Sequence, residues 1–362
     1  MTQSDLTLSR KLVTRRGRAA LSNRVGRFEP YVVEAVEDGW QPPEEEPLRT
    51  EVSVESPRKV ITRNASPDLN FDRSVNPYRG CEHGCIYCFA RPTHAWLGYS
   101  AGLDFETRLI ARPIAPDRLR AELLRPSYEV APIAIGTNTD PYQPIERRYR
   151  VMRGLLDVLS EFRHPVGVVT KGTLIERDLD ILGEMGRAGL AGVGVSVTTL
   201  DNAVSRAMEP RVPAPARRLK MIERLAEAGV PVRVMVSPVV PGLTDHELEA
   251  ILGAARDAGA VAASYILLRL PGEVGPLFRE WIEQAFPDRA ARVMGRMRQM
   301  RGGEDYDAAF GTRMVGEGEF ARLLAHRFDL AARRLGLRRD LPQLRHDLFK
   351  RPAQPGDQLS LF

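Results

Sequence analysis

The sequence predicts an α/β fold in which six βα units form a partial, open barrel. Three observations support this prediction. From about residue 70, short β-branched runs alternate with longer amphipathic stretches. There are six such units, two fewer than a closed eightfold barrel contains. The chain has 362 residues, 43% of them apolar, which is enough for one large core or two average domains.

Residues 1–60 precede the barrel and are expected to form a largely disordered, charged tail. They are rich in Pro and Glu around residues 41–47 and show little apolar periodicity. Their charge is uneven, because residues 10–27 hold seven Lys or Arg and no acid, whereas residues 28–55 hold nine acids and one Arg.

The strands and helices of the barrel follow one another along the chain. Strands that alternate with helices pair in parallel through right-handed crossovers, and apolar strands suit a sheet covered by helices. Thr244 and Glu247 are predicted to form a capping box. The predicted strands are Phe71–Tyr78, Ile133–Thr139, Val166–Lys171, Gly192–Thr198, Val230–Val239 and Ala262–Leu270, and the predicted helices lie near 115–125, 147–163, 175–189, 201–228 and 244–258.

Beyond about residue 272 the alternation stops and the chain is expected to be helical. Val293, Met297 and Met300 share one helical face, and a second apolar stripe runs from Phe320 to Leu335, which predicts two core-packing faces. We expect a basic helical extension over residues 301–351 and a flexible tail over residues 352–362.

Charge and hydropathy narrow the class of protein. The net charge of +5 permits a polyanionic partner without requiring one. The basic blocks are either solvated helix faces or contacts for nucleic-acid phosphates. No apolar run approaches the length of a membrane helix and the N-terminus lacks a signal-peptide core, which predicts a cytoplasmic protein. The Arg-rich start leaves a mitochondrial transit peptide as the alternative.

The three cysteines of the chain, Cys81, Cys85 and Cys88, lie within eight residues. An odd and tightly clustered set is no disulfide framework and predicts a metal site. Sulfur ligands suit either zinc, with His83 as the nearest fourth ligand, or an iron–sulfur cluster with one iron left open. Gly80 and Gly84 give the loop the backbone freedom to wrap around such a centre.

This CX3CXYC loop, placed after the first strand of a six-unit βα pattern, resembles the radical S-adenosylmethionine (AdoMet) superfamily over residues 66–300. The resemblance implies a TIM-type radical SAM core and a [4Fe–4S] cluster held by the three cysteines. It implies that AdoMet binds the open iron and is cleaved to a 5′-deoxyadenosyl radical, which takes hydrogen from the substrate. It also implies a low-potential reductant such as flavodoxin or ferredoxin.

The chain is most similar to the spore photoproduct lyase-like branch, which repairs DNA. The similarity rests on segments at or just after the predicted strand ends. They are residues 136–144, Thr170-Lys171, Ser196, Glu209-Pro210-Arg211 with Arg217 in the helix that follows, and residues 237–242. It implies that AdoMet is contacted by the backbone at Tyr87 and by Asn138, Asp140, Lys171, Ser196, Pro238 and Val239.

A barrel argument supports these residues independently, because barrel active sites lie at the carboxyl ends of the strands. Each residue could instead be a strand-end cap or a turn residue. Lys171 and Ser196 are expected to contact the ligand, with a structural role as the alternative. For Asp140 and Glu146 the two roles are equally supported. Arg217 is expected to form a surface salt bridge instead of contacting the ligand.

The chain departs from the lyase in one respect. That enzyme uses a further cysteine to return hydrogen to its product radical, whereas the cluster here would need all three cysteines. Tyr142 and Tyr265, predicted near strand ends, are candidate replacements, and their alternative role is packing.

The chain ends in Gln358-Leu359-Ser360-Leu361-Phe362, which resembles the pentapeptide by which bacterial repair proteins bind the sliding clamp. In such recognition Leu361 and Phe362 would fill an apolar groove and Gln358 would fix the register. The alternatives are docking on the chain's own domain or no role.

Three functions follow in order of preference. The first is a radical SAM enzyme that repairs or modifies DNA or a DNA-bound substrate. The second is a radical SAM enzyme acting on RNA or protein. The third is a non-enzymatic metal-binding clamp adaptor, in which zinc replaces the cluster.

Overall fold

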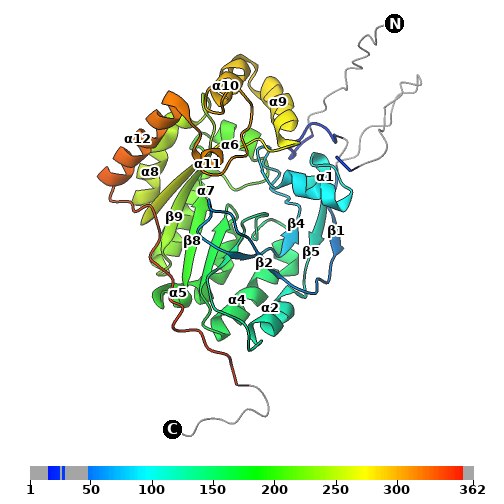
Figure 1. Ribbon diagram of the computed structural model, residues 1–362, viewed down its shortest axis with the longest axis vertical. Helices are drawn as coiled ribbons and strands as arrows, with labels where there is room; N and C mark the ends of the chain where they lie inside the picture. Colours follow the sequence, from blue (N-terminus) through cyan, green and yellow to red (C-terminus); the bar gives the residue numbers. More distant parts are fainter. Residues whose placement is uncertain (1–14, 25–26, 29–47, 354–362) are drawn as a thin grey trace, which may run out of the picture.

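The computed structural model describes residues 15–24, 27–28 and 48–353 (Figure 1). Its larger sheet contains six parallel strands in sequence order, with β2 (Ile61–Arg63) added antiparallel to β3 at one edge. All six expected strands are confirmed, and the sheet is open because β10 and β2 form its edges. The parallel strands are β3 (Arg73–Val75), β6 (Ile133–Ile135), β7 (Val166–Thr170), β8 (Ala191–Ser196), β9 (Val232–Val239) and β10 (Ala262–Leu267).

Helices cover the convex face of this sheet (Figure 1). The helix α4, for example, buries Leu155 and Leu159 while its other face meets solvent, as its amphipathic sequence requires. The covering helices are α2 (Ala115–Leu123), α4 (Val151–Glu161), α5 (Leu179–Arg187), α7 (Pro215–Glu227) and α8 (Leu248–Asp257). Shorter turns of helix lie between them: η1 (Arg91–Leu97), α1 (Leu103–Thr107), α3 (Glu146–Tyr149), η2 (Thr173–Asp178), α6 (Asn202–Met208) and η3 (Asp245–Glu247).

The strand register decides which side chains face the inside of the barrel. Ser196 pairs with Met235, and Met235 pairs with Ser264, so these three side chains share one face of the sheet. Tyr265 pairs with Val236 and therefore lies on the opposite, helix-covered face. There its ring centroid is 4.9 Å from that of Phe328.

The expectation of a disordered tail over residues 1–60 is wrong for part of this segment. Arg18, Ala19, Ala20 and Leu21 are buried. β1 (Glu51–Val54) joins β5 (Arg108–Ala111) and β4 (Tyr78–Arg79) in a second, smaller sheet. These contacts use main-chain groups, which the low apolar periodicity of the tail does not reveal.

The C-terminal part begins as expected with helices α9 (Val274–Ala285), α10 (Pro287–Gln299), α11 (Thr312–Val315) and α12 (Gly318–Arg334). Val293, Met297 and Met300 are buried, as predicted. The second stripe is buried at Leu324, Phe328 and Ala331, but Leu323, which also belongs to the stripe, is 51% exposed and does not pack in the core.

Residues 338–351 are not helical, which corrects the predicted extension. They run along the amino ends of the strands, where Arg338 bridges β10 and the Arg345 and Lys350 amides donate to Gly189 and Phe162. Figure 1 shows this segment descending past β8 and α5.

The predicted capping box of Thr244 and Glu247 does not form. The Thr244 hydroxyl accepts from the Val240 amide, and the Glu247 carboxylate accepts from Thr199 and the Leu200 amide. Both side chains therefore tie loops together. Among the described helices, none is long and apolar enough to cross a membrane.

Candidate cluster and AdoMet site

The three cysteines lie in a tight loop that follows β4 at the carboxyl edge of the sheet. Gly80 and Gly84 adopt φ values of 71° and 67°, a left-handed conformation that favours glycine. A Cβ atom on Gly84 would lie 2.8 Å from Glu106 Oε2, and one on Gly80 would lie 2.7 Å from Leu109 Cδ2. Both glycines are therefore required, as the sequence indicated.

The side chain of Arg91 holds this loop from behind and is fully buried. It donates to the carbonyls of Gly84 (3.1 Å) and Cys85 (3.0 Å) and forms an ion pair of 2.6 Å with Glu106. Two further bonds reach the carbonyls of Ala101 and Gly102. Sequence reasoning missed Arg91, although an arginine three residues after a cysteine motif was a visible signal.

The N-terminal segment packs on the same support. The amides of Ala19 and Ala20 donate to the Glu106 carboxylate at 3.3 and 3.0 Å, and Arg18 donates to the Glu106 carbonyl at 2.7 Å. Glu106 thus joins residues 18–20 to the underside of the cysteine loop.

Gln143 ties the cysteine loop to the carboxyl end of β6. Its amide oxygen accepts from the Glu82 N–H at 2.9 Å, and its amide nitrogen donates to the Gly80 carbonyl at 3.1 Å. Gln143 is fully buried, and it lies inside the 136–144 segment that the sequence pointed to.

The donor set fits a [4Fe–4S] cluster. The three thiols are free, with Cys81 and Cys85 buried and Cys88 partly exposed. Burial raises the pKa of the Cys85 thiol to about 12, against the opposing attraction of Lys171. No three His, Cys, Asp or Glu side chains of the described ranges are arranged around a single ion. A cluster places each thiolate on its own iron, so it does not need that arrangement.

On one side of the cysteine loop lies a buried chain of charges. The Tyr87 hydroxyl donates to Glu209, whose carboxylate forms a 2.7 Å ion pair with the fully buried Arg218. Arg218 also donates to the Ser196 carbonyl at 3.0 Å, and the Lys171 ammonium lies 5.8 Å from the Tyr87 ring centroid. Lys171, Ser196 and Tyr87, all predicted AdoMet contacts, are thus brought together.

Asp140 occupies the other side and is a positioning residue in this geometry. Its carboxylate accepts from Thr170 Oγ1 (2.6 Å) and the Lys171 amide (2.7 Å) and lies 3.3 Å from His83 Nδ1. Burial alone would raise the pKa of Asp140, but the attraction of His83 and these hydrogen bonds lower it to about 2. The ionised carboxylate therefore fixes the start of the loop that carries Lys171.

Polar groups near the carboxyl ends of the strands fit a ligand such as AdoMet. The hydroxyls of Thr198, Ser237 and Ser264 are buried and have no hydrogen-bond partner among the described residues. Asn138 is partly exposed at the same edge, whereas Pro238 and the Val239 side chain are buried, so that only the backbone of this turn is available there.

Four other candidates have structural partners. Tyr142 is buried and donates to Asp178 at 3.0 Å, and Glu146 accepts from Tyr78. Arg217 forms the expected salt bridge, here with Glu176. Tyr265 faces α12, away from the cysteine loop. The pentapeptide of Gln358, Leu359, Leu361 and Phe362 lies outside the described residues.

An open βα barrel with three free thiols at the carboxyl edge of its sheet is typical of proteins that hold an iron–sulfur cluster there. Comparison identifies the family, because the model of the radical SAM superfamily matches residues 75–255, half of the chain. The chain belongs to the radical SAM superfamily. Its cofactors are accordingly a [4Fe–4S] cluster and AdoMet.

Two relatives in sequence bear the name of uncharacterized proteins. An uncharacterized protein of Mycobacterium tuberculosis is 40% identical over 226 residues, which span 62% of this chain and 66% of that protein. An uncharacterized protein of Methanocaldococcus jannaschii is 24% identical over 214 residues, spanning 59% of this chain and 76% of that protein.

Among solved structures, spore photoproduct lyase complexed with dinucleoside spore photoproduct has a TM-score of 0.58 and 16% identity, covering 82% of this chain and 85% of that chain. A mutant of that lyase with bound AdoMet and the dinucleoside has a TM-score of 0.56 and 17% identity. At this identity the likeness establishes the fold alone.

Proposed function

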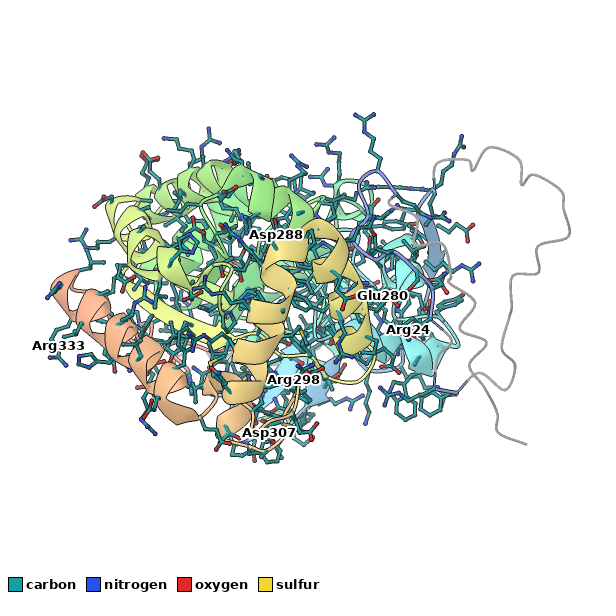
Figure 2. All side chains as sticks on the ribbon, turned by 90° about the horizontal axis from the view of Figure 1, so that it is seen from above. Arg24, Glu280, Asp288, Arg298, Asp307 and Arg333 are labelled. Atoms are coloured by element: carbon teal, nitrogen blue, oxygen red, sulfur yellow. The ribbon has the colours of Figure 1, made fainter. Side chains whose placement is uncertain are left out.

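We propose that this protein is a radical SAM enzyme that repairs or modifies DNA or a DNA-bound substrate. The observation that carries the proposal is the likeness of fold to spore photoproduct lyase over most of both chains. The exposed arginines 289 and 292 add positive charge to α10, whereas Arg298, labelled on this helix in Figure 2, is paired with Asp305.

The residues of the site divide into three roles. Cys81, Cys85 and Cys88 would hold the cluster, and Lys171, Ser196, the Tyr87 backbone and the turn at 237–239 would hold AdoMet. Bound there, the two cofactors supply the reductive cleavage that starts hydrogen abstraction. The barrel side chains orient AdoMet and exclude water from it.

The return of hydrogen to the product should differ from the lyase. The chain has no fourth cysteine, and both tyrosines proposed from the sequence have structural partners. We therefore favour a modification, or a repair that ends without a cysteine donor.

The test is an anaerobic assay of 5′-deoxyadenosine formation with reconstituted protein, AdoMet and a low-potential reductant such as flavodoxin or ferredoxin. Damaged or modified DNA should stimulate product formation above the level without substrate, and Cys85→Ala should abolish it. Stimulation by RNA or peptides alone would refute the choice of DNA. One zinc per chain without sulfide would favour the adaptor.

The C-terminal pentapeptide forms the second part of the proposal. It would bind a bacterial sliding clamp and keep the enzyme at DNA. Replacement of both Leu361 and Phe362 by Ala should abolish micromolar binding to the clamp, whereas Ser360→Ala should retain it. Equal binding by all three proteins would refute this role.

A further inference from the structure

Four large aromatic side chains are exposed in the described ranges, and one of them directly follows the cluster ligand Cys88. These are Phe28, Phe89, Trp96 and Phe310, which are 51%, 46%, 74% and 59% exposed. Soluble proteins bury most such rings, so the exposure of these four requires an explanation. We call this group, with the arginines that cover its rings, the aromatic–arginine strip.

The centre of the strip adjoins the cluster ligands. Phe89 directly follows Cys88, and the guanidinium of Arg269 lies 5.4 Å from its ring centroid. Arg269 follows β10 by two residues and donates to the Tyr306 hydroxyl at 3.2 Å. A ring at Phe89 therefore lies beside the place where the radical chemistry begins.

One flank continues through the segment before α12. Arg269 contacts the Met314 sulfur at 3.5 Å, and the preceding residue, Arg313, lies 4.4 Å from the Phe310 ring centroid. Asp68 anchors Arg313 through an ion pair of 2.5 Å. The guanidinium is thus fixed over one face of Phe310.

The other flank repeats this arrangement. Arg27 forms two hydrogen bonds to Glu273, of 2.9 and 2.8 Å, and lies 5.9 Å from the Phe28 ring centroid. Phe28 in turn packs against Trp96 at 4.6 Å between centroids. Figure 2 labels Asp307, which precedes Phe310 by three residues, and Arg24, which precedes Arg27 by three residues.

The same contact occurs three times, because an arginine guanidinium lies over the ring of Phe28, of Phe89 and of Phe310. Acidic partners hold two of these arginines in place, so their charge serves to fix the rings rather than to neutralise phosphates. Phe89 and Phe310, each covered by an arginine and about half exposed, offer flat apolar surfaces, and Trp96 offers a third where Phe28 packs against it. Unpaired bases stack on such surfaces, whereas bases in a duplex hide their faces.

We propose that the aromatic–arginine strip binds the unpaired bases of single-stranded DNA and leads them past the cysteine loop. This inference rests on the proposed function and specifies the form of its substrate. Stacking tolerates any base, so the strip should show little sequence preference.

The test measures the binding of a fluorescent 12-nucleotide DNA strand to the full-length, cluster-loaded protein under anaerobic conditions. Phe310→Ala and Phe89→Ala should each weaken binding by about fivefold or more. Phe310→Tyr should restore binding, because it keeps the ring. Leu323→Ala, an equally exposed apolar side chain on α12, should bind as the wild type does. Iron content, measured for every variant, shows whether the cysteine loop is intact.

Unchanged binding by both alanine variants with full iron content would overturn the proposal. Tighter binding of duplex DNA, or of RNA of the same sequence, would also overturn it. The result is separable from the proposed function. If the alanine variants bind DNA as the wild type does and DNA still stimulates 5′-deoxyadenosine formation, only the role of the strip is refuted. If binding of the strand depends on the rings but no DNA stimulates 5′-deoxyadenosine formation, only the proposed reaction on DNA is refuted.

Discussion

Arg91 illustrates how much a single side chain contributes to the cluster site. Its guanidinium is buried, paired with Glu106 and bonded to four carbonyls of the surrounding loop. Lysine offers the same charge without the planar fork that these bonds require. Arg91→Lys should therefore lower the free energy of unfolding by about 1–3 kcal/mol for each buried carbonyl that it leaves without a donor.

Urea denaturation and iron analysis check this prediction. Arg217→Lys is the matched control, since Arg217 pairs with Glu176 while 41% of its side chain is exposed. The control should lose less than about 1 kcal/mol. Equal losses in the two variants would contradict the role assigned to Arg91.

His164 should make stability depend on pH. It is fully buried beside Tyr128, and burial lowers its pKa from 6.5 to about 4. Between these values the unfolded chain binds the proton and the folded chain does not, so stability falls as the pH drops from 6.5 towards 4. The loss should reach about 3 kcal/mol. The measurement is the free energy of unfolding in urea of the cluster-free protein between pH 6.5 and 4, with His164→Gln as the control. If the free energies of the two proteins changed with pH in parallel, the role of His164 would be contradicted.

Individual residues also show where sequence reasoning succeeds and fails. The cysteine spacing and the two glycines pointed directly at the loop, because a ligand loop needs both. The face on which Tyr265 lies could be predicted, because side chains alternate along a strand. Tyr265 is two residues from the buried Ala263 and so shares its face, whereas Ser264 lies on the other face. The partners of Arg91 and Gln143 were not available, because they depend on loops brought together only by folding.

At the scale of elements, the cysteine loop depends on the close approach of Glu106. Gly84→Ala would place a methyl group against that carboxylate, in addition to forcing an alanine to positive φ. We expect a loss of more than about 1–2 kcal/mol and a low iron content. Gly98→Ala is the control, because Gly98 also has positive φ but nothing lies within 4 Å of its Cβ position. Full iron content in Gly84→Ala would contradict this account.

The strands were predictable because their β-branched runs are buried on the helix-covered face, as in Val166–Thr170. The path of residues 338–351 was not predictable, because this segment is held by main-chain hydrogen bonds to Gly189 and Phe162, which require no periodic pattern of apolar residues. The same reason explains the error over residues 18–21.

At the scale of the whole molecule, the N-terminal segment supports the cluster site. Arg18 is buried and donates to the Glu106 carbonyl and Thr50. Arg18→Ala should leave these acceptors unsatisfied, cost about 1–3 kcal/mol and expose the loop. In air, the visible absorbance of the iron–sulfur cluster should therefore decay faster than in the wild type. Arg16→Ala, at an exposed position, should decay at the wild-type rate, and equal rates for both variants would contradict a protective role.

The path of residues 338–351 has a consequence for assembly. This segment brings the chain to the amino ends of the strands, where Arg351 donates to the carbonyls of Leu123 and Tyr128. The cysteine loop and the aromatic–arginine strip lie at the carboxyl ends. The last described residues therefore leave the barrel at the pole opposite its mouth. A partner that bound the chain at this pole would therefore leave the carboxyl ends of the strands uncovered.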